Sequence, residues 1–553
     1  MIKLTRLFLL LPLLTFAQNG LFDHQEKHTR QDTLRGSITP ERAWWNVTHY
    51  NLAVEVFPET KTLKGTNKIS FEVLDNHKRM QLDLQEPMLI TKILHHNNLI
   101  DQSLSFTREG NAYWVDFPNK LQKTTHHSIS VYFEGQPTES KNPPWSGGIT
   151  WRKDKNGTDF IASANQGIGA SIWWPNKDHD YDEPDNGALI SVTVPEHLTN
   201  VSNGRLIETI HLKKEHKKLF RWQVKNPINN YGVNINIGDY VHFSEKFNGE
   251  KGVLDCDYWV LKHNLEKAKE QFKQAKMTLT AFEHWFGPYP FYEDSYKLVE
   301  APYLGMEHQS SVTYGNKYRN GYLGSDLSRT GIGLKFDFII VHESGHEWFA
   351  NNITNKDVAD MWIHESFTAY SESLFIDYHF STQEAEDYVI GTRASIQNDK
   401  PLIGVYNVNQ EGSGDMYYKG ANMLHTLRQI INDDEQWRRI LRGLNFEFYH
   451  QQVTTKQIEN YISEKAGLDL NGFFDQYLRT IKIPVFEYKI KKNKLCYKFT
   501  NIVDNFNIPV KVWINNKEVW LDTSNKTESY KSVDNIKSFN VDKNFYLISV
   551  KNW

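Results

Sequence analysis

The sequence predicts a multidomain α+β protein in which a long β-rich segment, a helical segment and a short second β segment follow one another. Residues from about 40 to 245 contain repeated short runs of β-branched and aromatic residues, separated by Gly, Asn and Pro turns. Residues from about 261 to 480 instead space their apolar side chains as amphipathic helices do. Strand-like alternation returns after residue 483. With 553 residues, the chain is long enough for about three domains with separate cores.

Composition narrows the class of protein. The net charge is −4 and the sequence pI is about 6.6, so no basic field predicts a nucleic-acid partner. Only two cysteines occur, Cys256 and Cys496, and they lie far apart in the chain. We expect both to be free thiols, because two distant cysteines do not form a disulfide framework.

The first residues have the pattern of an export signal. Lys3 and Arg6 precede an apolar run over 7–16, which is too short to span a bilayer. The small-residue site at Ala17 suits cleavage, so we predict a signal peptide over 1–17 and export to the periplasm or the medium. An N-terminal anchor helix is the alternative. No later segment is apolar enough for a membrane span.

The first domain, over 18–257, is predicted to be a large antiparallel β assembly. Typical strand-like runs are 52–57, 68–73 and 128–133. Within this part, the acidic run 178–183 could imitate a metal site. It stands just before Pro184, so we interpret it as a surface turn.

The second domain is predicted to begin near residue 258 and to end near 482. A long amphipathic helix is expected from Leu261 to Trp285, followed by a Gly/Pro breaker over 286–290. Residues 421–480 are predicted to be helical as well, and Thr454 with Gln457 matches a capping box. The remaining residues, 483–553, contain short strands with Asn turns and suit a small β-sandwich.

The chemistry is concentrated in a His-Glu-x-x-His sequence at His342, Glu343 and His346. Residues four apart on a helix share a face, so both imidazoles can reach one zinc ion, and Glu343 would stand beside its water. Two histidines packed in a core are the alternative. Burying two imidazoles and a carboxylate without a metal would be costly, which favours zinc.

A third ligand is expected from Glu365. Eighteen residues separate it from His346, which leaves room for a turn and the start of a second helix that faces the first. The two histidines and Glu365 would leave a fourth position of zinc open, as catalytic sites do. With this motif set the chain resembles the M1 family of zinc aminopeptidases, which belong to the gluzincins, over nearly its whole length after the leader.

The resemblance implies a saddle-like β domain over 18–257 and a thermolysin-like, mostly helical zinc peptidase domain over 258–482. It also extends to Gly305, Met306 and Glu307, which are similar to the Gly-x-Met-Glu-Asn motif of M1 exopeptidases. Leu304 and His308 depart from that motif, which affects the shape of the substrate site. By resemblance, Glu307 binds the amino group of the substrate, and Gly305 and Met306 line its site.

A carboxylate is physically suited to this selection. A charge-assisted hydrogen bond forms with a free ammonium and not with an acylated nitrogen. The resemblance further implies that Gln166, in the Gly-rich loop 164–175, helps to hold the amino group. Tyr417, in the sequence Tyr-x-Lys-Gly, would donate a hydrogen bond to the tetrahedral intermediate, with Tyr418 as the alternative if the register differs. Glu372 either supports a ligand histidine or is exposed.

We therefore predict an aminopeptidase that uses one zinc ion per chain to hydrolyse the N-terminal amide bond of peptides with a free α-amino group. Two alternatives remain at this point. A thermolysin-type endopeptidase has the same zinc ligands, but Glu307 in its motif argues against it. A non-catalytic peptide-binding protein is the alternative outside the enzymes, and the complete set of catalytic residue types argues against that.

Overall fold

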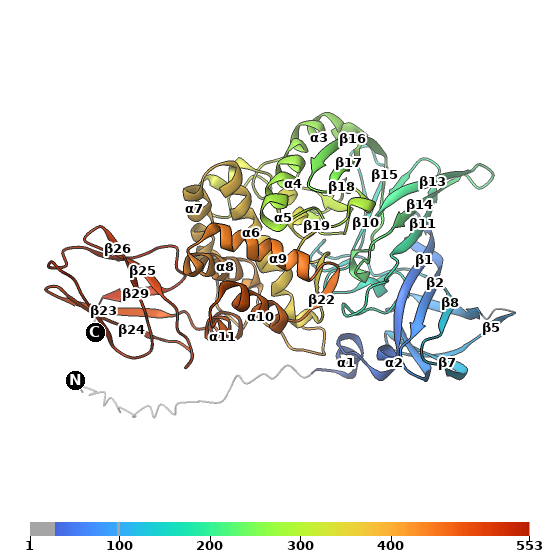
Figure 1. Cartoon of the computed structure of the whole chain (residues 1–553). Coiled ribbons are helices and arrows are strands. Elements are labelled where there is room, and N and C mark those ends of the chain that lie inside the picture. The colour runs from blue at the N-terminus through green and yellow to red at the C-terminus, as the bar shows by residue number, and fades with distance from the viewer. Residues whose placement is uncertain (1–27, 97–99, 552–553) are drawn as a thin grey trace, which may run out of the picture.

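A computed structural model describes residues 28–96 and 100–551. The signal peptide predicted over 1–17 lies outside these residues. A β-rich N-terminal part, a central helical part and a C-terminal β part follow one another in space as they do in the sequence (Figure 1). This order confirms the predicted multidomain α+β class.

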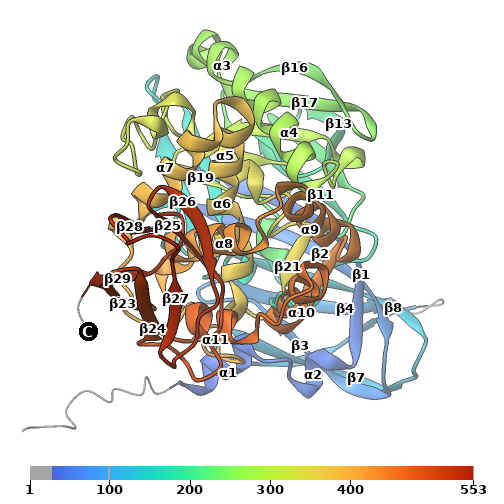
Figure 2. The same ribbon diagram turned by 60° about the vertical axis from the view of Figure 1, so that its left-hand side comes forward.

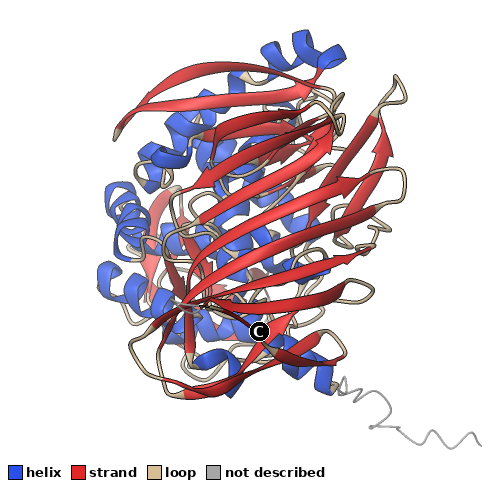
Figure 3. Ribbon diagram, turned by 90° about the vertical axis from the view of Figure 1, so that its right-hand side faces the viewer, coloured by secondary structure: helices blue, strands red, loops and turns tan. Residues whose placement is uncertain are grey.

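The N-terminal part is built around an eight-stranded sheet, which forms a broad twisted surface in Figure 3. Its strand order is β13-β14-β11-β1-β2-β8-β4-β5, and most neighbours are antiparallel, as predicted. Strands β1 and β11 pair in parallel, so the sheet is mixed. The strands that precede β16 are β1 Trp45–Phe57, β2 Thr62–Val73, β3 His77–Asp83, β4 Leu89–His96, β5 Asp101–Ser103, β6 Ser105–Glu109, β7 Ala112–Leu121, β8 His126–Gly135, β9 Gly148–Lys153, β10 Asp159–Ala164, β11 Ala188–Pro195, β12 Thr199–Val201, β13 Arg205–Leu212, β14 Lys217–Val224 and β15 Asn236–Gly238.

Two smaller sheets and two short helices complete this part. Strands β12, β15, β10 and β9 form one sheet, and β3, β7 and β6 form the other. The helices are α1 (Arg30–Gly36) and α2 (Pro40–Ala43). Strand β10 leads directly into the loop that carries Gln166, so this sheet determines where that side chain can reach.

The central part begins with a five-stranded sheet in the order β16-β17-β18-β20-β19. Its strands are β16 Tyr240–Gly249, β17 Gly252–Leu261, β18 Tyr296–Glu300, β19 Gly305–Met306 and β20 Val312–Tyr314. Strand β17 runs through residue 258, where we place the start of the second domain, and pairs with both β16 and β18. The domain boundaries themselves stay predictions.

The long helix expected over 261–285 is divided in two. A 3-10 turn over Lys262–Asn264 leads into α3 (Leu265–Gln271), and α4 (Lys273–Phe286) follows. The break falls at Phe272, whose side chain is buried. The apolar spacing is nearly continuous across Phe272, so the sequence pattern alone does not reveal the break.

Seven further helices make up most of the central part. Figures 1 and 2 show α6 in the middle of this layer, next to α5 and α8. The large aromatic side chains of Trp348, Trp362 and Phe367 are buried in the core here. The capping box of Thr454 and Gln457 is confirmed at the start of α10. The helices are α5 Phe338–Gly345, α6 Trp362–His379, α7 Thr382–Thr392, α8 Tyr418–Ile431, α9 Asp434–Glu447, α10 Thr455–Ala466 and α11 Asn471–Arg479, with the small pair β21 Ile353–Asn355 and β22 Gln451–Val453.

The C-terminal part consists of two sheets, in the orders β27-β24-β23-β29 and β26-β25-β28. Buried Phe486, Leu495 and Val512 contribute to its core, which agrees with the predicted sandwich. The strands are β23 Val485–Lys491, β24 Lys494–Thr500, β25 Val510–Ile514, β26 Lys517–Leu521, β27 Glu528–Lys531, β28 Phe539–Val541 and β29 Ile548–Lys551. Cys256 and Cys496 are both free thiols, as predicted. Within the described part of the chain, no helix is both long and apolar enough to cross a lipid bilayer.

The acidic run 178–183 is not the surface turn that we expected. Most of it is buried, and it joins the N-terminal part to strand β21. Asp180 accepts a hydrogen bond from the Asn355 amide at 2.9 Å, and Glu183 accepts one from the Thr354 hydroxyl at 2.7 Å. The prediction was wrong because these partners come from a remote segment, so the sequence around Pro184 does not reveal them.

Candidate metal centre and active site

Helix α5 presents two histidines to one point. Asp337 caps the helix by accepting hydrogen bonds from the backbone N–H groups of Ile339 and Ile340, at 3.1 and 3.4 Å. The imidazoles of His342 and His346 then lie one turn apart, with ring centroids 5.0 Å from each other. Both side chains are buried.

Glu365 reaches the same point from helix α6. Its Oε2 atom lies 3.4 Å from His346 Nε2 and 3.8 Å from His342 Nε2. One ligand atom from each of the three residues falls within 4.8 Å of the others. Glu365 Oε2 is buried and has no hydrogen-bond partner in the described residues. A buried carboxylate oxygen that is short of partners, beside two imidazole nitrogens, fits a zinc ion.

The outer nitrogens of both imidazoles are held by other groups. His342 Nδ1 lies 2.8 Å from Glu372 Oε1, and His346 Nδ1 lies 3.0 Å from the Phe349 carbonyl. Because each Nδ1 faces an acceptor, it carries the proton, and each Nε2 is left with a lone pair for a metal. Glu372 also accepts a hydrogen bond from the Tyr388 hydroxyl at 2.7 Å. Its carboxylate is buried, so the supporting role is the one that the structure favours.

The buried charges affect the protonation of Glu343 and Glu365. Burial raises the pKa of Glu343 to about 7, with Glu307 adding to the rise and His342 opposing it. A group that titrates near neutral pH can both accept and return a proton. Burial would also raise the pKa of Glu365, but His346 and His342 together lower it below its ordinary value. Glu365 therefore stays ionised, as a metal ligand must.

Strand β19 passes directly over Glu343. A Cβ atom on Gly305 would lie 2.8 Å from Glu343 Oε1 and 2.8 Å from a methyl carbon of Ile339. Only glycine fits without displacing one of them. Met306 follows and is buried. The edge of the five-stranded sheet and helix α5 therefore form adjacent walls of one site.

Glu307 and Gln166 meet beside the metal cluster. Gln166 Nε2 donates to Glu307 Oε1 at 2.7 Å and to Glu365 Oε1 at 3.1 Å. The backbone carbonyl of Glu307 accepts a hydrogen bond from Asn351 Nδ2 at 2.8 Å. Gln166 comes from the loop after β10, so the N-terminal part reaches into the helical part at this point.

Tyr417 stands at the start of α8 with its ring beside His342, at a centroid distance of 6.0 Å and an interplanar angle of 30°. Burial raises the pKa of Tyr417, and the charges of Glu365 and Glu307 raise it further, so its hydroxyl keeps its proton. Tyr418 instead lies close to Glu372. Of the two tyrosines, Tyr417 is thus the one whose ring lies beside His342.

Two residues of the site carry no signal in the sequence. Tyr231 is buried in the N-terminal part, and after burial itself the charge of Glu307 is the largest influence that raises the pKa of its hydroxyl. The Thr368 hydroxyl lies 3.1 Å from His346 Nδ1. A residue of each type is common in any core, so only the fold reveals their position.

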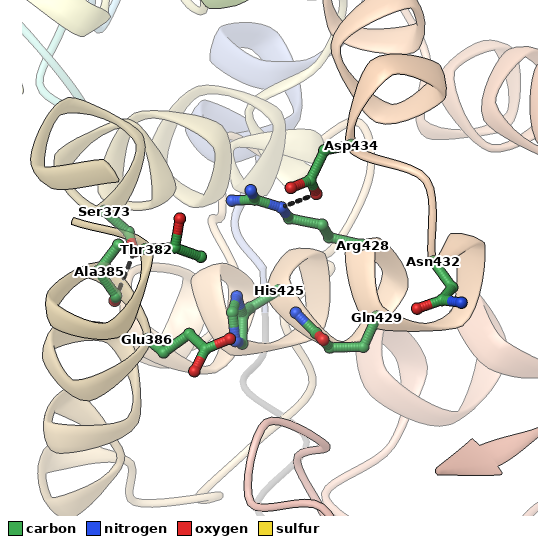
Figure 4. Close-up of a pocket in the computed structure, with 9 residues that line it drawn as sticks. All are labelled: Ser373, Thr382, Ala385, Glu386, His425, Arg428, Gln429, Asn432 and Asp434. Carbon is green, nitrogen blue, oxygen red and sulfur yellow. Dashed lines mark hydrogen bonds and ion pairs between the residues drawn. The ribbon is translucent and has the colours of Figure 1, made fainter. Parts of the chain in front are cut away.

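A cavity lies among helices α6 to α9, and its lining does not include His342, His346 or Glu365 (Figure 4). It has a volume of about 230 Å³. Arg428 in its wall pairs with Asp377 at 2.8 Å and with Asp434 at 2.7 Å, and His425 lies 3.0 Å from Asn544 Oδ1. The Arg428 guanidinium and the His425 imidazole in the cavity wall therefore have partners, which is typical of polar groups buried between packed helices.

Comparison with known proteins agrees with these observations. The profile of the Peptidase M1 N-terminal domain matches residues 46–231, and that of the Peptidase family M1 domain matches residues 270–477. Aminopeptidase N of Lactococcus lactis subsp. lactis is 23% identical over 481 residues, which are 81% of this chain and 52% of that protein. Puromycin-sensitive aminopeptidase of Caenorhabditis elegans is 23% identical over 469 residues, covering 79% of this chain and 47% of that protein. The chain thus spans about half the length of these relatives.

The fold is shared with a solved enzyme. The crystal structure of the M1 zinc metallopeptidase from Deinococcus radiodurans gives a TM-score of 0.65 at 19% identity, covering 78% of this chain and 94% of that one. A variant of it bound to the substrate Tyr-Ser-Ala gives a TM-score of 0.68 at 18% identity, covering 81% and 98%. The two profiles together match most of the N-terminal and central parts, and the His342, His346 and Glu365 cluster lies inside the second. The chain belongs to peptidase family M1.

Proposed function

We propose that this protein is a zinc-dependent aminopeptidase that hydrolyses the N-terminal amide bond of peptides with a free α-amino group. The observation that carries the proposal is the buried carboxylate of Glu307, which Gln166 holds beside the cluster of His342, His346 and Glu365. The aminopeptidases among the relatives support it. So does the Deinococcus radiodurans enzyme, whose variant binds a peptide substrate.

We propose one zinc ion per chain, held by His342, His346 and Glu365. The second group of potential ligands, Glu307, Glu343 and His346, shares His346 with the first, so the two groups would compete for it. A bound zinc ion supplies Lewis-acid polarisation of the scissile carbonyl and lowers the pKa of water.

The protein side chains would divide the remaining work. Glu343 accepts a proton from the attacking water and delivers it to the leaving amine, which suits a carboxyl with a pKa of about 7. The Tyr417 hydroxyl donates a hydrogen bond to the oxygen that becomes negative in the transition state. Glu307, assisted by Gln166, accepts hydrogen bonds from the ammonium group of the substrate.

This arrangement explains selection for a chain end. An ammonium group pairs with the buried Glu307 carboxylate, whereas an acylated nitrogen would leave that charge without a partner. A peptide with further residues on the amino side of this position has an amide nitrogen there instead of an ammonium group, so it would fit poorly. Glu307 therefore supports an exopeptidase rather than an endopeptidase.

We further propose that the protein is exported to the periplasm or the medium. The support is the sequence of the first residues, with Lys3 and Arg6 before the apolar run 7–16 and a small-residue cleavage site at Ala17. N-terminal sequencing of the protein purified from the exporting host tests this. A mature protein that starts at Gln18 agrees with it, and one that keeps Met1 contradicts it.

The activity is tested with a panel of aminoacyl fluorogenic amides, each beside its N-acetylated counterpart. The wild type and Glu343→Gln are assayed with and without a chelator, and zinc content is measured alongside. We expect cleavage of the free-amine set alone, lost on chelation and in the variant. Equal cleavage of the acetylated set would indicate an endopeptidase, and no turnover by a zinc-loaded protein would indicate a binding role.

A further inference from the structure

A large pocket with a strongly basic wall lies beside the start of strand β19. It has a volume of about 690 Å³ and lies between the β9–β10 hairpin, the start of α3 and the segments around residues 300–304 and 314–323. We call it the basic pocket. Its charged lining residues are Arg152, Lys153, Lys267, Lys317 and Arg319, with Glu300 as the acidic one.

Most of this positive charge is not neutralised. Glu300 is buried, and its carboxylate accepts hydrogen bonds from the backbone N–H of Leu261 at 2.8 Å and from the Asn264 side-chain amide at 2.7 Å. Lys153 pairs with Asp159 at 2.7 Å. Within 28–96 and 100–551, no ion pair involves the other four basic residues, which are Arg152, Lys267, Lys317 and Arg319. The chain as a whole has a net charge of −4, so this concentration of positive charge is local.

The pocket and the active site are lined by adjacent residues of one stretch of backbone. Glu307, the proposed ligand of the amino group, comes after β19, and Gly305 within β19 lies against Glu343. Leu304, which precedes β19, lines the basic pocket. Tyr303 also lines the pocket; burial raises the pKa of its hydroxyl, and the charges of Glu343 and Glu307 add to the rise. The pocket and the catalytic groups therefore share a wall.

This order gives a bound peptide a direction. If its amino group is at Glu307 and its scissile bond is at Glu343, the remaining residues continue toward Leu304 and the basic pocket. An extended chain advances about 3.3 Å per residue, so each further residue of the peptide carries its C-terminal end that much closer to the pocket. The group that every short peptide presents there is its C-terminal carboxylate.

We propose that the basic pocket binds the C-terminal carboxylate of peptides of about three to five residues, so that the protein prefers short peptides. This rests on the proposed aminopeptidase function. Arginine and lysine side chains form charge-assisted hydrogen bonds with carboxylates, and arginine can do so through two N–H groups at once. Together with Glu307, the pocket would recognise both charged ends of a short peptide.

The test compares alanine peptides of two, four and eight residues, each as the free acid and as the C-terminal amide. For the wild type we expect kcat/KM for the four-residue acid to exceed that of its amide by about tenfold or more, with a ratio near one for eight residues. In the triple variant Arg152→Gln, Lys317→Gln, Arg319→Gln, the ratio for four residues should fall to near one. These three side chains are exposed, so the variant should fold, and thermal melting checks this.

The matched control is Lys155→Gln, which removes one positive charge from the same β9–β10 hairpin without altering the pocket lining. It should keep the wild-type ratio. Equal rates for acid and amide in the wild type would overturn the proposal. So would a preference for the acid that persists in the triple variant.

Binding separates this proposal from the proposed activity. Calorimetry with zinc-loaded Glu343→Gln should give tighter binding of the four-residue acid than of its amide, and the triple variant in this background should lose the difference. If the wild type turns over no peptide but this binding difference is present, the proposed activity fails and the pocket assignment stands. Equal binding of acid and amide refutes the pocket assignment whatever the activity.

Discussion

Replacing Glu307 by Gln should remove most of the discrimination between a free and an acetylated amino terminus. The Glu307 side chain is buried, so solvent screens its charge little. Hydrogen bonds to charged groups contribute about 1.5–3 kcal/mol, and about 1.4 kcal/mol corresponds to a factor of ten. We therefore expect kcat/KM for free-amine substrates to fall by about 10- to 100-fold. Glutamine keeps the shape and one acceptor oxygen, so Gln166 and Asn351 need not move.

The assay measures kcat/KM for paired aminoacyl amides and their N-acetylated counterparts, with zinc content determined on the same samples. Zinc should be retained, because Glu307 is not among His342, His346 and Glu365. The ratio between free and acetylated substrates should fall even if the absolute rates differ among side chains. A variant that keeps the wild-type ratio would refute the assignment of Glu307 as the amino-group ligand. Loss of zinc would show instead that Glu307 supports the metal.

Three further predictions follow from the geometry. Tyr417→Phe should lower kcat by about 10²–10³ with zinc retained, and Tyr418→Phe should not; the reverse result in a steady-state assay would mean that the donor is Tyr418. Gly305→Ala should lower kcat/KM at least about tenfold at unchanged zinc content, because its Cβ would lie 2.8 Å from Glu343 Oε1; wild-type kinetics would show that β19 can shift. Burial raises the pKa of Glu183 to about 8, so its stabilising contribution is complete below the ordinary value of 4.5 and is lost as pH rises to about 8. Thermal melting of Glu183→Gln should therefore vary less between pH 5 and pH 8.5 than that of the wild type, and an equal variation would contradict this.

The proposed zinc ligands are predictable from the sequence because their arrangement is local. His342 and His346 share a face through helical spacing, and the eighteen residues between His346 and Glu365 leave room for a turn and the start of a second helix. The β segments and the C-terminal sandwich follow from alternation and turn residues in the same way. Gln166, Glu307 and Tyr417 are different, because their role was expected only from resemblance to the family.

What the sequence cannot show depends on contacts between remote segments. The acidic run 178–183 looks like a solvated turn, but Thr354 and Asn355 provide the donors that make its burial acceptable. Tyr231 comes close enough to Glu307 for the charge of that carboxylate to affect its pKa only when the N-terminal part packs against the central part. The helical pattern of apolar residues is nearly continuous at Phe272, so the break there depends on how this buried side chain packs in the core.

The position of Gln166 explains why the site needs both domains. Glu307 and Glu365 bring two carboxylates close together, and like charges in a buried site repel each other. The side-chain amide of Gln166 donates to one oxygen of each, so it reduces that repulsion without adding charge. Both of its N–H groups are then engaged, and its carbonyl oxygen remains as an acceptor for an ammonium group. A glutamate at this position would add a third negative charge. The loop after β10 thus connects Glu365, the proposed metal ligand, to Glu307, the proposed amino-group ligand. Under the proposed function, selection for a chain end depends on how the N-terminal and central parts pack.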